Sequence, residues 1–311
     1  MRTGTIPLPK SLQPTTTFDA GVPPMNKTVL HLFRKVLLTL SAVTLLLCLN
    51  SCAFMVQDYD LLLGLNEPQE EADMSVSQLI ARMREATDPK GVWYNCKSYI
   101  LRQSAVSEEK KGFSKIERYY TTEIKFRQPT QMRQTSYQDG MPFQTLLFRD
   151  NKGWIINDKG KATEYTGEGM KLFRNYVGFA DPKASEQTLF STVELAVVYE
   201  EGKRYYRMVC RTADPELPPY VKYIDATTFL TDRIETVLCM PDGAHFLYRS
   251  ESRDYRWINN VRMPMVSVVT IENVSTQAFH TQELLIDPKL PESDFTIPGG
   301  TSIDYTKTKT E

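Results

Sequence analysis

The chain has 311 residues, 41% of them apolar, and its 37 basic and 38 acidic residues give a formal net charge of -1. This length suffices for one large folded domain or two small ones. The even charge balance argues against nucleic-acid binding, which depends on clustered Lys and Arg. The 16 tyrosines and 14 phenylalanines favour β-strands over helices.

Residues 36–49 form an apolar run that has the pattern of a secretory signal. Lys27, Arg34 and Lys35 precede it, and a basic region followed by an apolar stretch of this length is typical of export signals. A membrane-spanning helix needs about 20 apolar residues, so the run is short for one, and a signal anchor stays the alternative. We expect residues 25–51 to be the signal peptide.

The residues ahead of this signal do not fit it. Five prolines fall within residues 1–24, whereas Met25 begins a signal of conventional form. We therefore interpret residues 1–24 as a non-native extension and expect translation to start at Met25.

Leu49-Asn50-Ser51-Cys52 follows the apolar run and resembles the bacterial lipobox. The small residue before the cysteine fits the cleft of the signal peptidase, and the cysteine thiol receives the diacylglycerol before cleavage. We expect Cys52 to be the first mature residue and to carry acyl chains such as palmitate. A free cysteine in an ordinary signal peptide is the alternative.

Residues 52–74 have the composition of a lipid anchor followed by a tether. Acidic residues and Pro68 favour a solvated, irregular chain there. The apolar patch at residues 61–65 is the exception, and two placements remain open for it, against the domain or at the lipid surface.

A helix is predicted directly after the tether. Ser75 and Gln78 have the spacing of a capping box. Apolar residues then recur at i, i+3, i+4 and i+7 from Val76, which gives one apolar stripe. Asp88-Pro89-Lys90-Gly91 ends the helix.

From Trp93 the apolar period changes to two, which is typical of β-strands. Turn signals at Asp139-Gly140 and Asn151-Lys152-Gly153 separate the strands. The short connections favour an antiparallel meander. The strands expected here are 94–103, 116–127, 131–138, 142–149 and 153–157.

Residues 168–178 interrupt the strands with the spacing of a helix. Met170, Phe173 and Val177 share one side of it, and Gly178 can close it. A short turn of helix or a loop is expected between residues 181 and 187.

Strands then resume, with turn signals at Glu201-Gly202 and Asp242-Gly243. In the strand 229–239, Leu230, Ile234 and Leu238 point one way and polar residues the other, as in a sheet with one wet face. The strands expected here are 191–200, 204–212, 219–226, 229–239, 245–256 and 263–274, followed by an extended piece at 279–286.

These elements predict a mainly β (α+β) fold. An antiparallel sheet of about 11 strands must curl to bury its apolar face, and the helices are available to cover the concave side. The expected folded domain spans residues 75–290, with a C-terminal tail at 291–311.

Four segments of this meander resemble the LolA/LolB-like lipoprotein-sorting family, in the family's order across residues 75–290. They are Lys152–Ile156, Tyr205–Val209, Tyr223–Leu230 and Asp254–Pro264, the last with Asn260 where the family usually has Gly. The resemblance implies an unclosed half-barrel with a helical lid over an apolar cavity that takes acyl chains. LolB-type members are themselves lipoproteins, in agreement with Cys52.

Sequence motifs for catalysis or metal binding are not found. His245 and His280 lie 35 positions apart on different expected strands, which does not favour a shared metal site. No nucleophile, metalloprotease or phosphate-binding motif occurs. We therefore expect no enzyme activity, no catalytic residue, no metal and no cofactor; a hydrolase would need a polar cluster that the sequence does not indicate.

Three mature-chain cysteines besides Cys52 are expected to be buried free thiols, although an oxidising compartment would permit one disulfide. Cys210 and Cys239 fall on strands two apart in a simple meander, which is too far for a disulfide. The third is Cys96.

The favoured hypothesis is an outer-membrane lipoprotein, facing the periplasm and anchored through Cys52, that binds acyl chains of a lipoprotein or lipid by burying their methylenes. The alternative is an interaction or structural module with a filled core. The expected cavity residues are Tyr120, Ile124, Phe126, Leu146, Phe148, Trp154, Ile156, Met170, Phe173, Tyr206, Met208, Ile234 and Leu238.

Overall fold

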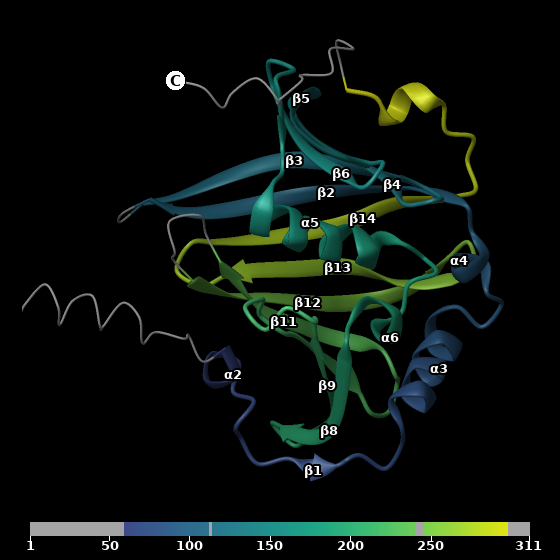
Figure 1. Ribbon diagram of the computed structural model, residues 1–311, viewed down its shortest axis with the longest axis vertical. Coiled ribbons are helices and arrows are strands. Elements are labelled where there is room, and N and C mark those ends of the chain that lie inside the picture. The colour runs from purple at the N-terminus through teal and green to yellow at the C-terminus, as the bar shows by residue number, and fades with distance from the viewer. Residues whose placement is uncertain (1–58, 112–113, 240–244, 298–311) are drawn as a thin grey trace, which may run out of the picture. The chain divides into compact units, whose positions relative to one another are not determined.

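One antiparallel sheet organises the part of the chain that the computed structural model describes, which is residues 59–111, 114–239 and 245–297 (Figure 1). Its fourteen strands lie in the order β1-β8-β9-β10-β11-β12-β13-β14-β2-β3-β4-β5-β6-β7. The strands are β1 (Glu70–Glu71), β2 (Ser98–Lys111), β3 (Ser114–Arg127), β4 (Gln131–Gln138), β5 (Met141–Arg149), β6 (Lys152–Asn157), β7 (Ala162–Glu164), β8 (Thr192–Glu200), β9 (Lys203–Arg211), β10 (Tyr220–Asp225), β11 (Thr231–Cys239), β12 (His245–Ile258), β13 (Val261–Ile271) and β14 (Ser275–Ile286).

Tight hairpins join most neighbouring strands, as the turn signals predicted. Asp139 and Gly140 between β4 and β5 have φ values of 52° and 76°, and Glu201 and Gly202 between β8 and β9 have 51° and 79°. Two successive residues with positive φ match the twist of antiparallel strands. The predicted turn at Asp242-Gly243 lies outside the described residues.

The sheet is not closed, because β1 and β7 form its two free edges. Two long meanders, β2–β7 and β8–β14, join where β14 pairs with β2, with Phe279 opposite Ala105. A mainly β fold with one large, unclosed antiparallel sheet is thereby confirmed. The strands number more than eleven because β1 and β7 are short and the piece expected at 279–286 is part of the full strand β14.

The longer helices follow the predicted positions. In α3 (Val76–Thr87) the capping box between Ser75 and Gln78 is formed. The residues expected to start the first strand instead form α4 (Val92–Asn95), and α6 (Glu186–Leu189) occupies the predicted short turn.

The central helix α5 (Gly167–Ala180) lies across one face of the sheet (Figure 1). Its position follows from the topology, because β7 is one edge strand and β8 lies beside the other edge. The connection between them has to cross the sheet, and its apolar side chains turn towards the strands. We call this side the α5 face.

The opposite face of the sheet is covered at both ends of the described chain. Residues 59–71 belong to the segment 52–74 that was expected to be an anchor and tether, but they form α2 (Tyr59–Leu62) and β1 and pack on β8–β11. For Leu63 and Leu65 of the apolar patch, this is the placement against the domain. Residues from the expected tail form the 3-10 helix η1 (Glu292–Phe295), whose Phe295 is fully buried. The expected extension, the signal peptide and Cys52 lie outside the described residues.

Candidate functional site

The first part of the α5 face, which we call the covered zone, lies beneath α5. Six expected cavity residues meet there: Ile124, Phe126, Leu146, Phe148, Met170 and Phe173. Phe173 is stacked on Tyr165 with ring centroids 4.8 Å apart and meets Phe148 edge-on at 6.0 Å. These side chains pack against Met132 and Val177, which are fully buried, so the covered zone is filled by protein atoms.

Polar contacts fix α5 over this zone. The Tyr99 hydroxyl donates to the carbonyl oxygen of Ala180 at 2.9 Å, and the Tyr176 hydroxyl contacts Gln134 on β4. Burial raises the pKa of the Tyr99 phenol well above its usual value, so this hydroxyl stays a donor at neutral pH. Thr122 on β3 is buried on the same face, and its Oγ1 has no hydrogen-bond partner.

A second part of the α5 face, the half-buried zone, continues along the strands. The register brings the expected cavity residues Tyr120, Ile234 and Leu238 to this side. Apolar neighbours on the same side, each half-buried, are Phe246, Val269, Ile271 and Phe279. The Tyr120 and Phe279 rings meet edge-on at 6.2 Å, and the Tyr120 hydroxyl donates to Gln277 Oε1 at 3.0 Å.

Two further expected cavity residues on the α5 face, Tyr206 and Met208, lie under α3 and α6. Both are buried beside Leu79 and Phe190. A pocket of about 310 Å³ opens at the border of this cluster, between α3 and the α5–α6 connection. The Lys222 ammonium forms an ion pair with Glu186 in it, and each side chain is only 11–12% exposed.

Trp154 and Ile156 are not brought together with the other expected cavity residues. Leu147 and Trp154 are register partners, as are Thr145 and Ile156, and this set occupies the opposite face. There Ile156 and Leu147 pack on Phe295 of η1, with Trp154 at the border of the cluster. The prediction that these two residues share a cavity with Phe126 and Phe148 is therefore wrong, because it assigned β6 the opposite alternation.

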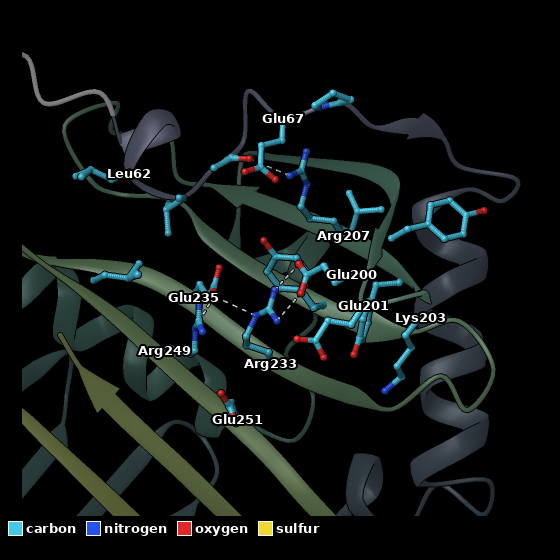
Figure 2. Close-up of a pocket in the computed structure, with 18 residues that line it drawn as sticks. Leu62, Glu67, Glu200, Glu201, Lys203, Arg207, Arg233, Glu235, Arg249 and Glu251 are labelled. Carbon is cyan, nitrogen blue, oxygen red and sulfur yellow. Dashed lines mark hydrogen bonds and ion pairs between the residues drawn. The ribbon is translucent and has the colours of Figure 1, made fainter. Parts of the chain in front are cut away.

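Elsewhere the opposite face carries a charged pocket of about 740 Å³, between β8–β12 and residues 62–68 (Figure 2). Figure 2 shows Arg233 between Glu200 and Glu235. Both terminal nitrogens of Arg233 donate to Glu200, at 2.8 and 2.7 Å, and Arg249 Nε donates to Glu235 at 2.7 Å. These bonds from Arg233 lower the pKa of Glu200.

Two charged side chains of the face that was expected to be wet are buried at this pocket. Glu235 is only 4% exposed and Arg207 3%, since residues 62–68 lie over them. Arg207 donates to the backbone carbonyls of Gly64 and Leu65, at 3.2 and 3.4 Å. Most charges of this pocket are thus compensated within the protein. Their burial could not be predicted from the sequence, because the covering segment 62–68 is distant from these strands in the chain.

The described residues contain no cluster of three or more His, Cys, Asp or Glu side chains placed to hold a metal ion. His245 lies beside Tyr59, with ring centroids 5.9 Å apart, and His280 is exposed. Cys96 and Cys210 are buried free thiols, and burial raises the pKa of each to about 12.

Comparisons with known proteins found similarity only at the level of structure. No family model and no curated protein matches the chain. A LolA superfamily protein from Nitrosomonas europaea is 10% identical with a TM-score of 0.48, over 72% of this chain and 98% of its own. An outer membrane lipoprotein-sorting protein domain from Vibrio parahaemolyticus is 10% identical with a TM-score of 0.45, over 70% and 94%.

A DUF1329 family protein from Desulfovibrio piger is also similar, at 10% identity and a TM-score of 0.47, over 70% of this chain and 95% of its own. Structures of the family that the sequence motifs resemble are therefore among those similar to this chain. Because each of these TM-scores is below 0.5, the likeness assigns no function, which has to come from the residues of the chain itself.

Proposed function

We propose that the protein is a lipid-anchored, non-enzymatic protein of the bacterial cell envelope that binds acyl chains, of a lipoprotein or a lipid, on the α5 face. The observation that carries the proposal is the half-buried zone. Leu238, Phe246, Ile271 and Phe279 are half-buried apolar side chains that the register places on this face of four neighbouring strands. Burying an acyl chain on such surface is favourable by about 0.8 kcal/mol per methylene.

The covered zone also supports the proposal, because an acyl chain could extend into it. Met170 and Phe173 of α5 separate it from solvent, and an unbranched Met side chain adapts to different partners. A long chain would start on the half-buried zone and displace α5 side chains as it enters. In this arrangement α5 acts as a lid.

Anchoring at the membrane is the second component of the proposal. It is supported by the lipobox that ends at Cys52, and we place the anchored domain at the periplasmic face of the outer membrane. Within the described ranges, no helix has the length and apolarity required to cross a bilayer.

A second candidate function is a non-catalytic envelope module that recognises a protein. The observation in its favour is the filled state of the covered zone, where Phe126, Met132 and Val177 are each at most 1% exposed. In that function α5 stays closed and the half-buried zone is part of the protein-binding surface.

The test is to express the full chain in bacteria supplied with a fatty acid that carries both a photoreactive group and an alkyne. Label that appears without ultraviolet light reports covalent acylation, and peptide mass spectrometry should place it on Cys52. Label that requires light reports a bound chain, and we expect it on peptides of β11, β12 and β14. Leu238→Asn should reduce the light-dependent label, whereas the control Val274→Asn, at a side chain 39% exposed in the β13–β14 turn, should not.

The outcomes separate the two components. Light-dependent label that is absent, or that Leu238→Asn and Val274→Asn leave equally strong, contradicts acyl binding on this face and favours the module. Light-independent label that is missing from Cys52 contradicts the anchor.

A further inference from the structure

Residues 59–71, which we call the strap, are fixed on the opposite face by specific contacts. Arg211 holds Asp60 with two hydrogen bonds of 2.9 Å, one to each carboxylate oxygen. Arg207 binds two backbone carbonyls of the strap, and Glu70 and Glu71 pair with β8 as the edge strand β1. The strap is thus part of the folded domain, and its orientation is set by the sheet.

This fixed orientation divides the apolar patch at residues 61–65 in two. Leu63 is 4% exposed and packs with Val198, Val209 and other side chains of β8–β11, and Leu65 packs at the border of the same cluster. Leu61 is 69% exposed, and Leu62, at the border of the charged pocket, is 47% exposed. Two adjacent exposed leucines on one short helix form a small apolar projection from the domain.

The length of chain before the strap determines what this projection can meet. Only six residues, 53–58, separate Cys52 from Tyr59. Even fully extended, the seven Cα–Cα steps from Cys52 to Tyr59 reach about 23–25 Å at ~3.3–3.6 Å per residue. A lipid on Cys52 would therefore hold α2 within that distance of the bilayer surface.

We propose that Leu61 and Leu62 insert into the membrane that holds the lipid of Cys52, and that this second contact orients the domain on the bilayer. The inference rests on the proposed lipid attachment, but it adds a protein surface, α2, whose partner is a lipid surface. A single acyl-chain anchor fixes distance only, whereas an anchor plus an apolar protein contact fixes orientation.

The charges of the strap itself favour an apolar contact over an electrostatic one. The strap carries Asp60, Glu67, Glu70 and Glu71 and has no Lys or Arg. Arg211 compensates Asp60, and Tyr199 donates a hydrogen bond to Glu70 at 3.4 Å. Insertion should therefore occur in vesicles of zwitterionic lipid and should not weaken as salt is raised.

The experiment places the photoreactive residue p-benzoylphenylalanine at position 61 or 62 of the full-length lipoprotein, reconstituted in phosphatidylcholine vesicles. The matched control is position 141, where Met141 is 70% exposed at the start of β5, in the half of the sheet remote from the strap. After illumination we expect phospholipid adducts at 61 and 62, no such adducts at 141, and no change with added salt.

Intact mass of the same samples distinguishes this inference from the proposed anchor. If Cys52 carries its lipid and positions 61 and 62 give no more adduct than position 141, the inference is overturned while the anchor stands. If Cys52 is unmodified, the anchor has failed. Adducts at 61 and 62 on that unmodified protein would still support the insertion, and their absence would overturn it.

Discussion

Gly153 on β6 illustrates how a single residue positions the central helix. A Cβ atom at this position would lie 2.3 Å from Cδ1 of Phe173, well inside van der Waals contact. The aromatic ring of α5 therefore packs directly on the backbone of β6, which only a residue without a side chain permits. The glycine of the Lys152-Gly153-Trp154 motif is therefore required for the close packing of α5 on β6.

We expect Gly153→Ala to lower the free energy of unfolding by about 1–3 kcal/mol, because Phe173 has to move off its buried site. Gly169→Ala is the matched control. Gly169 is helical, the nearest atom to its added Cβ would be at 3.5 Å, and replacement of a helical Gly by Ala is stabilising by about 0.5–1 kcal/mol. Denaturant titration of both variants checks the pair, and an unchanged midpoint for Gly153→Ala would contradict the close packing.

The ion pair between Glu186 and Lys222 makes stability depend on pH. Burial acts to raise the pKa of Glu186, but the neighbouring Lys222 ammonium prevails and the pKa is lowered from 4.5. A carboxyl whose pKa is lower in the folded than in the unfolded state contributes stability above its ordinary pKa. That contribution is lost as the pH falls through the folded value.

Glu186→Gln should therefore cost about 3 kcal/mol near neutral pH, since it leaves a buried ammonium without its counter-charge. The difference from the wild type should shrink as the pH is lowered below 4.5. Melting temperatures across this pH range measure it. A difference that stayed constant, or grew on acidification, would show that the pair does not carry the effect.

At the scale of elements, α5 decides between a lid and a permanent cover. Phe173 is only 6% exposed, while Arg174 points to solvent. If α5 is a permanent cover, Phe173→Ala should cost about 3–5 kcal/mol. If it is a mobile lid, the loss should be smaller and the uptake of a fluorescent acyl probe should change, with Arg174→Ala neutral in both assays.

Melting curves recorded with and without the acyl probe distinguish a lid from a permanent cover. A large drop in melting temperature for Phe173→Ala, with no probe bound by either protein, would refute the lid.

The period and turn chemistry of the sequence predicted most strands, because alternation and residues such as Asp139-Gly140 are local signals. Alternation fails where both faces of a strand are covered. On β6, Gly153 and Ile155 face α5 while Trp154 and Ile156 face η1, so apolar residues occur on both sides. The pattern there does not distinguish the two alternations.

The sequence predicted only part of the candidate site, because alternation identifies the face of a residue only where the other face of the strand is polar. Tyr120, Ile234 and Leu238 lie on strands whose other face is polar, and the register brings them to one side of the sheet. That they line a cavity stays a prediction. The charged pocket was missed, since Arg207 and Glu235 read as solvent-facing until residues 62–68 are placed over them. Docking of a remote segment is a tertiary event without a local signature.

At the scale of the whole molecule, the pairing of β14 with β2 makes the two meanders one sheet. We expect a single cooperative unfolding transition, because most strands have partners on both sides and the β2–β14 ladder runs the length of both strands. Removing residues from 275 onwards should abolish folding of both meanders. A truncated chain that kept one meander stably folded, as judged by limited proteolysis, would contradict a single unit.

The pairing of β14 with β2 also affects the order in which the sheet can assemble. Ser104 and Gln282, which are hydrogen-bonded across it, lie 178 positions apart in the chain. A polypeptide that is synthesised from its N-terminus presents β2 long before β14 exists to pair with it. The edge of β2 that later pairs with β14 is unpaired during this time, and unpaired strand edges favour aggregation with other chains. During synthesis, aggregation is therefore most favoured before the last long strand, β14, is available. A factor that shields the edge of β2 over that interval should raise the yield of folded protein.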